Sequence, residues 1–118
     1  MLLTTAPMTT SRTRHHTAEV DGHAVFYREA GDPTDPTLVL LHGAPASSFM
    51  FRDLIPLLAD RYHVIAPDYL GFGLSDVPPT DEFEYTFDAL TDSVEALLGR
   101  LGVDRFTIYV QDLSLIHI

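Results

Sequence analysis

Three short runs of hydrophobic residues set the pattern of this chain. They are TLVLLHG at residues 37–43, YHVIAPD at 62–68 and RFTIYV at 105–110. Each run is continuous rather than alternating, which is typical of a buried strand in a parallel sheet that is covered on both faces. Strands that alternate with helical segments predict an α/β fold with a mostly parallel sheet and crossover helices.

The two segments between these runs have helical patterns. The second segment is the clearer helix, since Thr86 is a suitable N-cap and Gly102 a suitable end. The first segment covers residues 47–60, where Pro56 disfavours an uninterrupted helix because proline lacks a backbone donor. Its expected cap is Ser47 or Ser48, and its expected buried stripe consists of Leu54, Ile55, Leu57 and Leu58.

A β-hairpin is predicted before the first run. Asp21-Gly22 separates two extended segments, and glycine accepts the positive φ of a tight turn at little cost. The second segment alternates in a way that predicts one solvent-exposed face. Its alternating residues are Val25 and Tyr27 on one side and Phe26 and Arg28 on the other. The fold class is therefore α/β, with an N-terminal hairpin followed by a mostly parallel sheet.

The composition limits the classes of binding partner that we expect. The chain has 118 residues, a formal net charge of −10 and no cysteine. An acidic surface repels nucleic-acid phosphates and anionic lipids, so neither nucleic acid nor membrane is an expected partner. No apolar run approaches the roughly 20 residues of a membrane span. We expect a cytoplasmic protein, and the residues imply no metal and no cofactor.

The ends of the chain differ from its centre. Residues 1–16 lack the apolar centre of a secretory signal and are expected to be a disordered leader. Residues 17–112 are expected to form the folded part. The final LSLIHI, residues 113–118, can be encoded by CTG TCT CTT ATA CAC ATC, the end sequence used in transposon-based library preparation. We therefore expect a non-native, adapter-derived tail, and any other codon set in the DNA would contradict this.

Three loops follow the carboxyl ends of the predicted parallel strands. They are HGAPASS at 42–48, PDYLGFGLSD at 67–76 and QDLS at 111–114. Ligands of open parallel sheets bind beyond the carboxyl ends of the strands. These loops are therefore expected to converge on one site.

The three loops together resemble the amino-terminal part of the α/β-hydrolase fold family, and they are most similar to its epoxide hydrolase and haloalkane dehalogenase branch. The resemblance runs from about Val20 to Asp112. It implies that Asp112 is the nucleophile at the strand-to-helix turn called the nucleophile elbow. It also implies that backbone N–H groups of Ala44 and Leu113 form the oxyanion hole. The other motif residues are implied to be structural: His42, Gly43, Pro45, Asp68, Gly71, Gly73 and Ser75.

The resemblance implies a parent enzyme that hydrolyses an epoxide or a carbon–halogen bond of a small molecule through an alkyl-enzyme ester on Asp112. Two features depart from the family pattern. Haloalkane dehalogenases usually have asparagine where this chain has Ala44, which favours an enzyme similar to epoxide hydrolases or fluoroacetate dehalogenases. Relatives also have an aromatic residue and a glycine after the nucleophile, whereas this chain has Leu113-Ser114.

The histidine base and its acidic partner have no counterpart here. Only His117 follows Asp112, and it is too close in sequence to serve as the base. His63 lies in a strand pattern and is expected to be a packed or surface histidine rather than the base. We therefore expect this chain alone to be an inactive fragment, with its last strand at an open sheet edge that promotes self-association. For Asp112 itself the alternative is an ordinary helix cap.

Two other functions remain open. A non-catalytic α/β domain that binds a small ligand or a partner chain is the alternative from a different class. A serine-type esterase is less favoured because no serine occupies the elbow. A late histidine and acid in the uninterrupted gene would support the enzyme.

Overall fold

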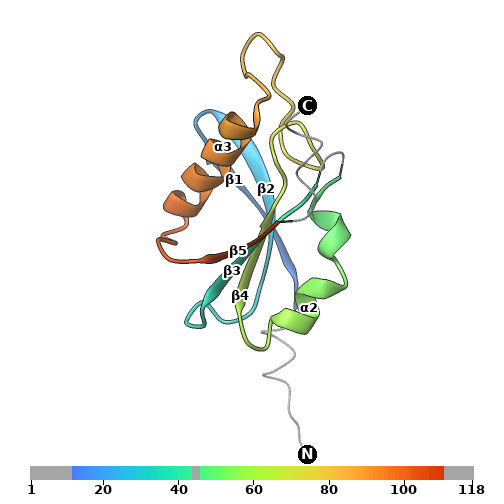
Figure 1. Ribbon diagram of the computed structural model, residues 1–118, viewed down its shortest axis with the longest axis vertical. Coiled ribbons are helices and arrows are strands. Elements are labelled where there is room, and N and C mark those ends of the chain that lie inside the picture. Colours follow the sequence, from blue (N-terminus) through green and yellow to red (C-terminus); the bar gives the residue numbers. More distant parts are fainter. Residues whose placement is uncertain (1–11, 44–45, 111–118) are drawn as a thin grey trace, which may run out of the picture.

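A computed structural model describes residues 12–43 and 46–110 of the chain. A five-stranded mixed sheet has the order β1-β2-β4-β3-β5 and carries helices on both faces (Figure 1). The strands are β1 (Arg14–Val20), β2 (His23–Ala30), β3 (Thr37–Leu41), β4 (His63–Pro67) and β5 (Thr107–Val110). The helices are the 3₁₀-helix η1 (Ser48–Phe51) and the α-helices α2 (Leu54–Leu58) and α3 (Phe87–Arg100). This arrangement confirms the predicted α/β fold class.

The hairpin forms as predicted, but it starts earlier than the expected leader boundary at residue 16. Strand β1 begins at Arg14, which pairs with Glu29 of β2. Residues 14–16 therefore belong to the sheet. Asp21 and Gly22 have φ values of 51° and 85°, the conformation that a two-residue hairpin turn requires.

The central strands run parallel. Strand β3 pairs in parallel with β4 on one side and with β5 on the other, where Leu41 lies opposite Val110. The hairpin joins this group through antiparallel pairing of β2 with β4. Strand β5 therefore lies at an edge of the sheet, as expected for the last strand.

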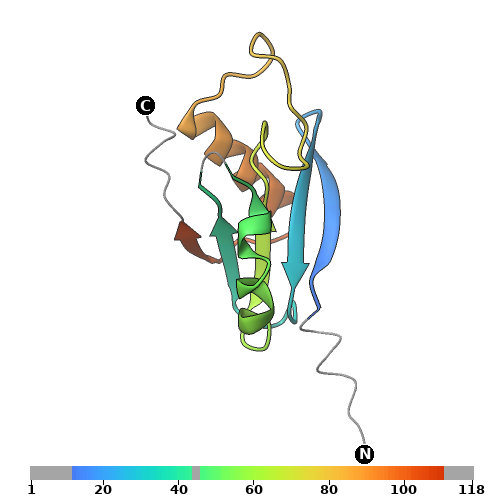
Figure 2. The same cartoon turned by 90° about the vertical axis from the view of Figure 1, so that its right-hand side faces the viewer.

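Alternate residues of the central strands serve two hydrophobic cores. In Figure 2, α2 lies in front of the sheet and α3 behind it. The side of α3 buries Val39, Leu41 and Ile65, while the side of η1 and α2 buries Leu40, Val64 and Ala66. The continuous apolar runs are explained by this double coverage.

The predicted capping residues of α3 are confirmed at both ends of the helix. The Thr86 hydroxyl accepts a hydrogen bond from the Ala89 N–H at 3.1 Å, and Gly102 takes a positive φ of 76° just after the helix. The segment 47–60 differs from its prediction, since it is divided into η1 and α2. Pro56 lies in the first turn of α2, where a backbone donor is not needed.

Two expected burial patterns were wrong. Leu57, assigned to the buried stripe, is 74% exposed because it points away from the sheet side occupied by Ile55. Strand β2 has no solvent-exposed face, since Phe26 and Arg28 are buried on the side of η1. Strand β5 has the apolar sequence of a buried strand, but its side chains are exposed in the part of the chain that the structure describes, which agrees with the open apolar edge expected for this chain.

Candidate active site at the carboxyl edge of the sheet

The ends of the parallel strands bring the three candidate loops to one edge. His42 follows β3 and Asp68 follows β4, while β5 ends at Val110 in register with Leu41. Four residues named from the sequence lie outside the described residues: Ala44, Pro45, Asp112 and Leu113. The described part of the site is therefore its supporting framework.

His42 connects the loops after β3 and β4. Its side chain is fully buried, and its Nδ1 lies 2.8 Å from the carbonyl oxygen of Gly43, to which it donates. Its Nε2 accepts a hydrogen bond from the Tyr69 N–H at 3.1 Å. Burial lowers the pKa of the imidazole, more than the Gly43 carbonyl and Asp68 raise it. Both nitrogens are thus engaged in the neutral ring, which suits a structural role rather than that of a base.

Asp68 organises the loop that follows β4. Its buried carboxylate accepts hydrogen bonds from the Ser48 N–H at 2.6 Å and from the Leu74 N–H at 2.9 Å. The Ser75 hydroxyl donates to the Asp68 carbonyl oxygen and accepts from the Phe26 N–H, each at 2.8 Å. A carboxylate whose oxygens are occupied by backbone donors holds a loop in place and is poorly placed to attack a substrate.

At two positions of this loop, neighbouring side chains lie so close to the backbone that only glycine fits. Gly73 has φ +55°, and a Cβ there would lie 2.2 Å from an Asp68 carboxylate oxygen. Gly71 has φ +88°, and a Cβ there would lie 2.5 Å from the Tyr85 ring. A side chain at either position would displace the loop, so these glycines are part of the framework.

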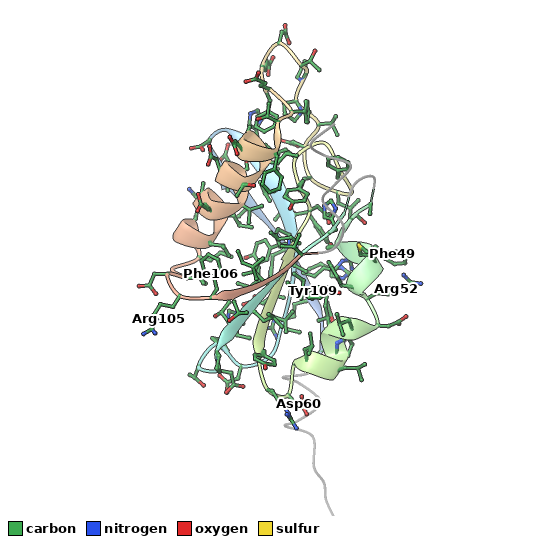
Figure 3. All side chains as sticks on the ribbon, viewed as in Figure 1. Phe49, Arg52, Asp60, Arg105, Phe106 and Tyr109 are labelled. Carbon is green, nitrogen blue, oxygen red and sulfur yellow. The ribbon has the colours of Figure 1, made fainter. Side chains whose placement is uncertain are left out.

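An open groove of about 530 Å³ lies between η1 and the loop after β4. It is lined by Ala46, Ser47, Phe49, Met50, Arg52, Gly71, Phe72 and Gly73. Figure 3 shows Phe49 and Arg52 next to each other, with the guanidinium carbon of Arg52 at 4.3 Å from the ring centroid of Phe49. Among the described residues, no group of three acidic, histidine or cysteine side chains could hold a metal ion. No helix in the described ranges is long and apolar enough to cross a membrane.

Tyr69 is the unusual group of this edge. Its ring packs against His42 with centroids 4.6 Å apart, and its buried hydroxyl has no hydrogen-bond partner within the described residues. Burial raises the pKa of this phenol to about 12. Its hydroxyl therefore stays protonated across the physiological range.

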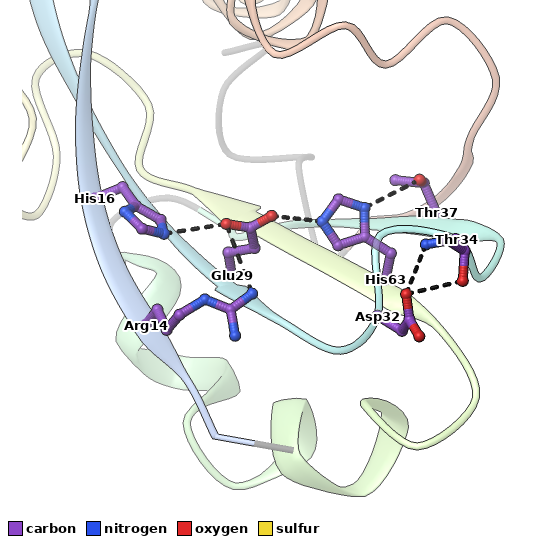
Figure 4. Close-up of polar contacts among 7 residues, drawn as sticks. All are labelled: Arg14, His16, Glu29, Asp32, Thr34, Thr37 and His63. Atoms are coloured by element: carbon purple, nitrogen blue, oxygen red, sulfur yellow. Dashed lines mark hydrogen bonds and ion pairs between the residues drawn. The ribbon is translucent and has the colours of Figure 1, made fainter. Parts of the chain in front are cut away.

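A second polar cluster lies at the opposite end of the sheet (Figure 4). Glu29 accepts from His63 at 2.5 Å and from His16 at 3.0 Å, and Arg14 lies 3.8 Å away. The Nδ1 of His63 lies 3.3 Å from the Thr37 hydroxyl. His63 is buried within β4, as expected for a packed histidine, and it is remote from the carboxyl edge.

Sequence reasoning missed two residues of the framework. Ser48 was considered only as a helix cap, yet its N–H binds Asp68 and its hydroxyl accepts from Arg28. Arg28 was considered only as part of an alternating strand with one solvent-exposed face. The four residues SFMF of η1 gave no sign that they would cover β2, so no local signal pointed to either role.

Comparisons with known proteins identify the family. A family model described as the alpha/beta hydrolase fold matches residues 36–113. An uncharacterized hydrolase of Saccharomyces cerevisiae is 48% identical over 84% of this chain and 34% of its own length. Haloalkane dehalogenase 2 of Mycobacterium tuberculosis is 43% identical over 75% of this chain and 29% of its own length.

A solved structure gives the same result. Epoxide Hydrolase A of Mycobacterium thermoresistibile matches with a TM-score of 0.79 and 34% identity, over 89% of this chain and 33% of that protein. The chain thus spans about a third of the length of the relatives it matches. Because family model, sequence and structure agree, the chain belongs to the α/β-hydrolase fold family, of whose larger fold it is a fragment.

Proposed function

We propose that the whole protein containing this chain hydrolyses an epoxide or a carbon–halogen bond of a small molecule, with Asp112 as the nucleophile. The observation that carries this proposal is the position of Asp112 in the chain, two residues after the end of β5. Strand β5 ends in register with β3, next to the start of the loop that His42 holds in place. A carboxylate at this point suits attack on an electrophilic carbon. The haloalkane dehalogenase and epoxide hydrolase among the relatives support the same chemistry.

The proposed reaction has two steps. A carboxylate oxygen of Asp112 bonds to the substrate carbon, and the carbon–halogen or epoxide carbon–oxygen bond breaks. The halide leaves with the electron pair of the broken bond. In an epoxide the oxygen keeps that pair and takes a proton from water or from an acid outside residues 1–118. Water then attacks the carbonyl carbon of the ester, which releases the alcohol or diol and restores Asp112.

In this mechanism the N–H groups of Ala44 and Leu113 stabilise the oxyanion of the second step. Ala44 has no side-chain amide for a departing halide, which favours an enzyme similar to epoxide hydrolases or fluoroacetate dehalogenases over a typical haloalkane dehalogenase. The water must lose a proton to a histidine from a part of the whole protein outside residues 1–118. His42 is unsuitable because both its nitrogens are engaged, and His63 lies at the other end of the sheet. The chain alone is therefore proposed to be inactive.

The test is isotope labelling of the whole protein. One turnover in H₂¹⁸O places ¹⁸O in the nucleophile, because water attacks the carbonyl carbon of the enzyme ester. We expect the label on Asp112 in peptide mass spectra, and we expect Asp112→Asn to abolish turnover of terminal epoxides and bromoalkanes. Asp104→Asn, which changes an exposed carboxylate before β5, is the matched control.

The outcomes separate the alternatives. Label on a different carboxylate would overturn the assignment of Asp112. Hydrolysis of a carboxylic ester through an acyl adduct on serine would identify an esterase. Neither turnover nor label with any of these substrates would favour the non-catalytic ligand-binding domain.

A further inference from the structure

Two buried charges near the carboxyl edge lack a direct partner of opposite sign. Arg28 is 9% exposed and Asp68 is 1% exposed, and neither forms an ion pair with any described residue. A buried charge without compensation strongly destabilises a fold. The structure must therefore compensate Arg28 and Asp68 in another way.

Ser48 connects the two charges. The Nε of Arg28 donates to the Ser48 hydroxyl at 2.9 Å, and the Ser48 N–H donates to the Asp68 carboxylate at 2.6 Å. The rest of the guanidinium is held as well. One Nη donates to the Nε2 of His15 at 2.9 Å, and the guanidinium carbon lies 5.3 Å from the Phe26 ring centroid and 5.6 Å from that of Phe49.

Ser48 also marks one end of the loop that follows β3. The other end is His42, whose Nε2 accepts from the Tyr69 N–H at 3.1 Å. Both ends of this loop are therefore tied to two consecutive residues, Asp68 and Tyr69. Ala44, the proposed oxyanion donor, lies between these two anchors in the sequence.

We propose that Arg28 is a positioning residue for the oxyanion loop. Arg28 acts through Ser48: it fixes the Ser48 side chain, and the Ser48 amide holds the Asp68 carboxylate. The positive charge of Arg28 and the negative charge of Asp68 balance each other across this serine. This inference rests on the proposed function, because it assigns Arg28 an effect on the chemical step. It extends that function to a strand, β2, that contributes no group to the reaction.

The kinetic test uses the whole protein with Arg28→Gln, Arg28→Lys and Ser48→Ala. Loss of loop positioning should lower kcat by about tenfold to a hundredfold in Arg28→Gln, with KM nearly unchanged, because misplacement of a catalytic group by about 1 Å costs this much. Arg28→Lys keeps the charge and should recover part of the loss. Ser48→Ala removes only the hydroxyl link and should lower kcat in the same direction. Arg61→Gln, at an exposed arginine, is the control.

Amide hydrogen exchange gives a second readout that does not depend on activity. In Arg28→Gln and Ser48→Ala, protection of the Ser48 and Leu74 amides should fall, while amides of α3 keep their protection. If the wild-type protein hydrolyses none of the substrates, the proposed function fails and exchange still tests the inference. If Arg28→Gln does not fold, Ser48→Ala decides. Unchanged kcat together with unchanged exchange of these amides would overturn the proposal.

Discussion

Two buried histidines of the same sheet have opposite surroundings. His42 follows β3 at the carboxyl edge, and its partners are a backbone carbonyl and a backbone amide. His63 begins β4 at the other end, and its partners are the Glu29 carboxylate and the Thr37 hydroxyl. The first histidine therefore works as a neutral connector and the second as part of a charged cluster.

The two ends of the sheet therefore differ in how they are held. We call the carboxyl edge around His42, Asp68 and Ser75 the rigid end, and the opposite edge around Glu29 the ionic end. At the carboxyl edge, His42, Asp68 and Ser75 are each bound to backbone groups, so they fix the course of two loops. At the other end, Glu29 of β2 contacts side chains from the two neighbouring strands, β1 and β4, so its contribution depends on charge. An active site needs the first kind of support, since catalytic groups must be held within a narrow range of positions.

The largest expected effect compares the two histidines directly. His42→Ala should destabilise the chain by about 3 kcal/mol, because it leaves a cavity and a buried Tyr69 N–H without an acceptor. His63→Ala should cost about 1–2 kcal/mol, since Glu29 keeps His16 as a partner. Urea denaturation followed by circular dichroism measures both. An equal or larger loss for His63→Ala would contradict the assignment of the rigid end.

The next effect tests the packing of the carboxyl edge. Gly73→Ala should destabilise by about 2–3 kcal/mol, because the added Cβ meets the Asp68 carboxylate and the residue keeps a positive φ. Gly99→Ala is the matched control, since a Cβ there meets nothing within 4 Å and alanine favours the helix. Its stability should be unchanged or raised by up to about 1 kcal/mol. Similar stability of the two variants would show that the loop adapts.

The sequence predicted those parts of the fold whose causes are local. The turn at Asp21-Gly22 and the cap at Thr86 depend on single residues, and the continuous apolar runs identify strands with two covered faces. The loops at the carboxyl edge followed from the order of the elements. The structure places the motif residues His42 and Asp68 at this edge, and their hydrogen-bond partners were not predicted from the sequence.

The remainder depends on contacts between distant segments. Arg28 meets Ser48 across 20 positions of the chain, and the Phe26 N–H meets Ser75 across 49. Alternation within β2 gave no information on what would cover its second face. The division of residues 47–60 into η1 and α2 likewise depends on how this segment packs on the sheet, which leaves Leu57 outside.

Alkaline pH should act on the rigid end through Tyr69. The pKa of its phenol is raised from 10.0 to about 12, so the unfolded state ionises first and stability is lost as pH rises between these values. The part of the loss due to Tyr69 should reach roughly 2 kcal/mol in the wild type and should be missing in Tyr69→Phe. The part due to Tyr27, whose pKa is also raised by burial, should remain in both proteins. At neutral pH this variant should be as stable as the wild type or more stable, because the hydroxyl has no partner among the described residues. A parallel pH dependence in both proteins would contradict the burial of this group.

Acidic pH should act on His42. Its pKa is lowered from 6.5, so between that value and the lower folded one only the unfolded state takes up a proton. The stabilising contribution of the neutral imidazole is complete above pH 6.5 and is lost as pH falls below that value. His42→Asn should show a correspondingly shallower decline from pH 6.5 to 5.5 in urea denaturation, since the other histidines contribute to both proteins. An equally steep decline would show that His42 is protonated in the fold.

The smallest effect tests the ionic end. Glu29→Gln keeps the size of the side chain but removes the charge that faces His16, His63 and Arg14, and it should cost about 0.5–1 kcal/mol at pH 6. The difference from the wild type should shrink in 1 M NaCl, because salt screens partly exposed charges. The cost of His42→Ala should stay constant in the same salt, since the neutral imidazole is bound to backbone groups. If salt changed both costs equally, or neither, the distinction between a neutral and a charged end of this sheet would be wrong.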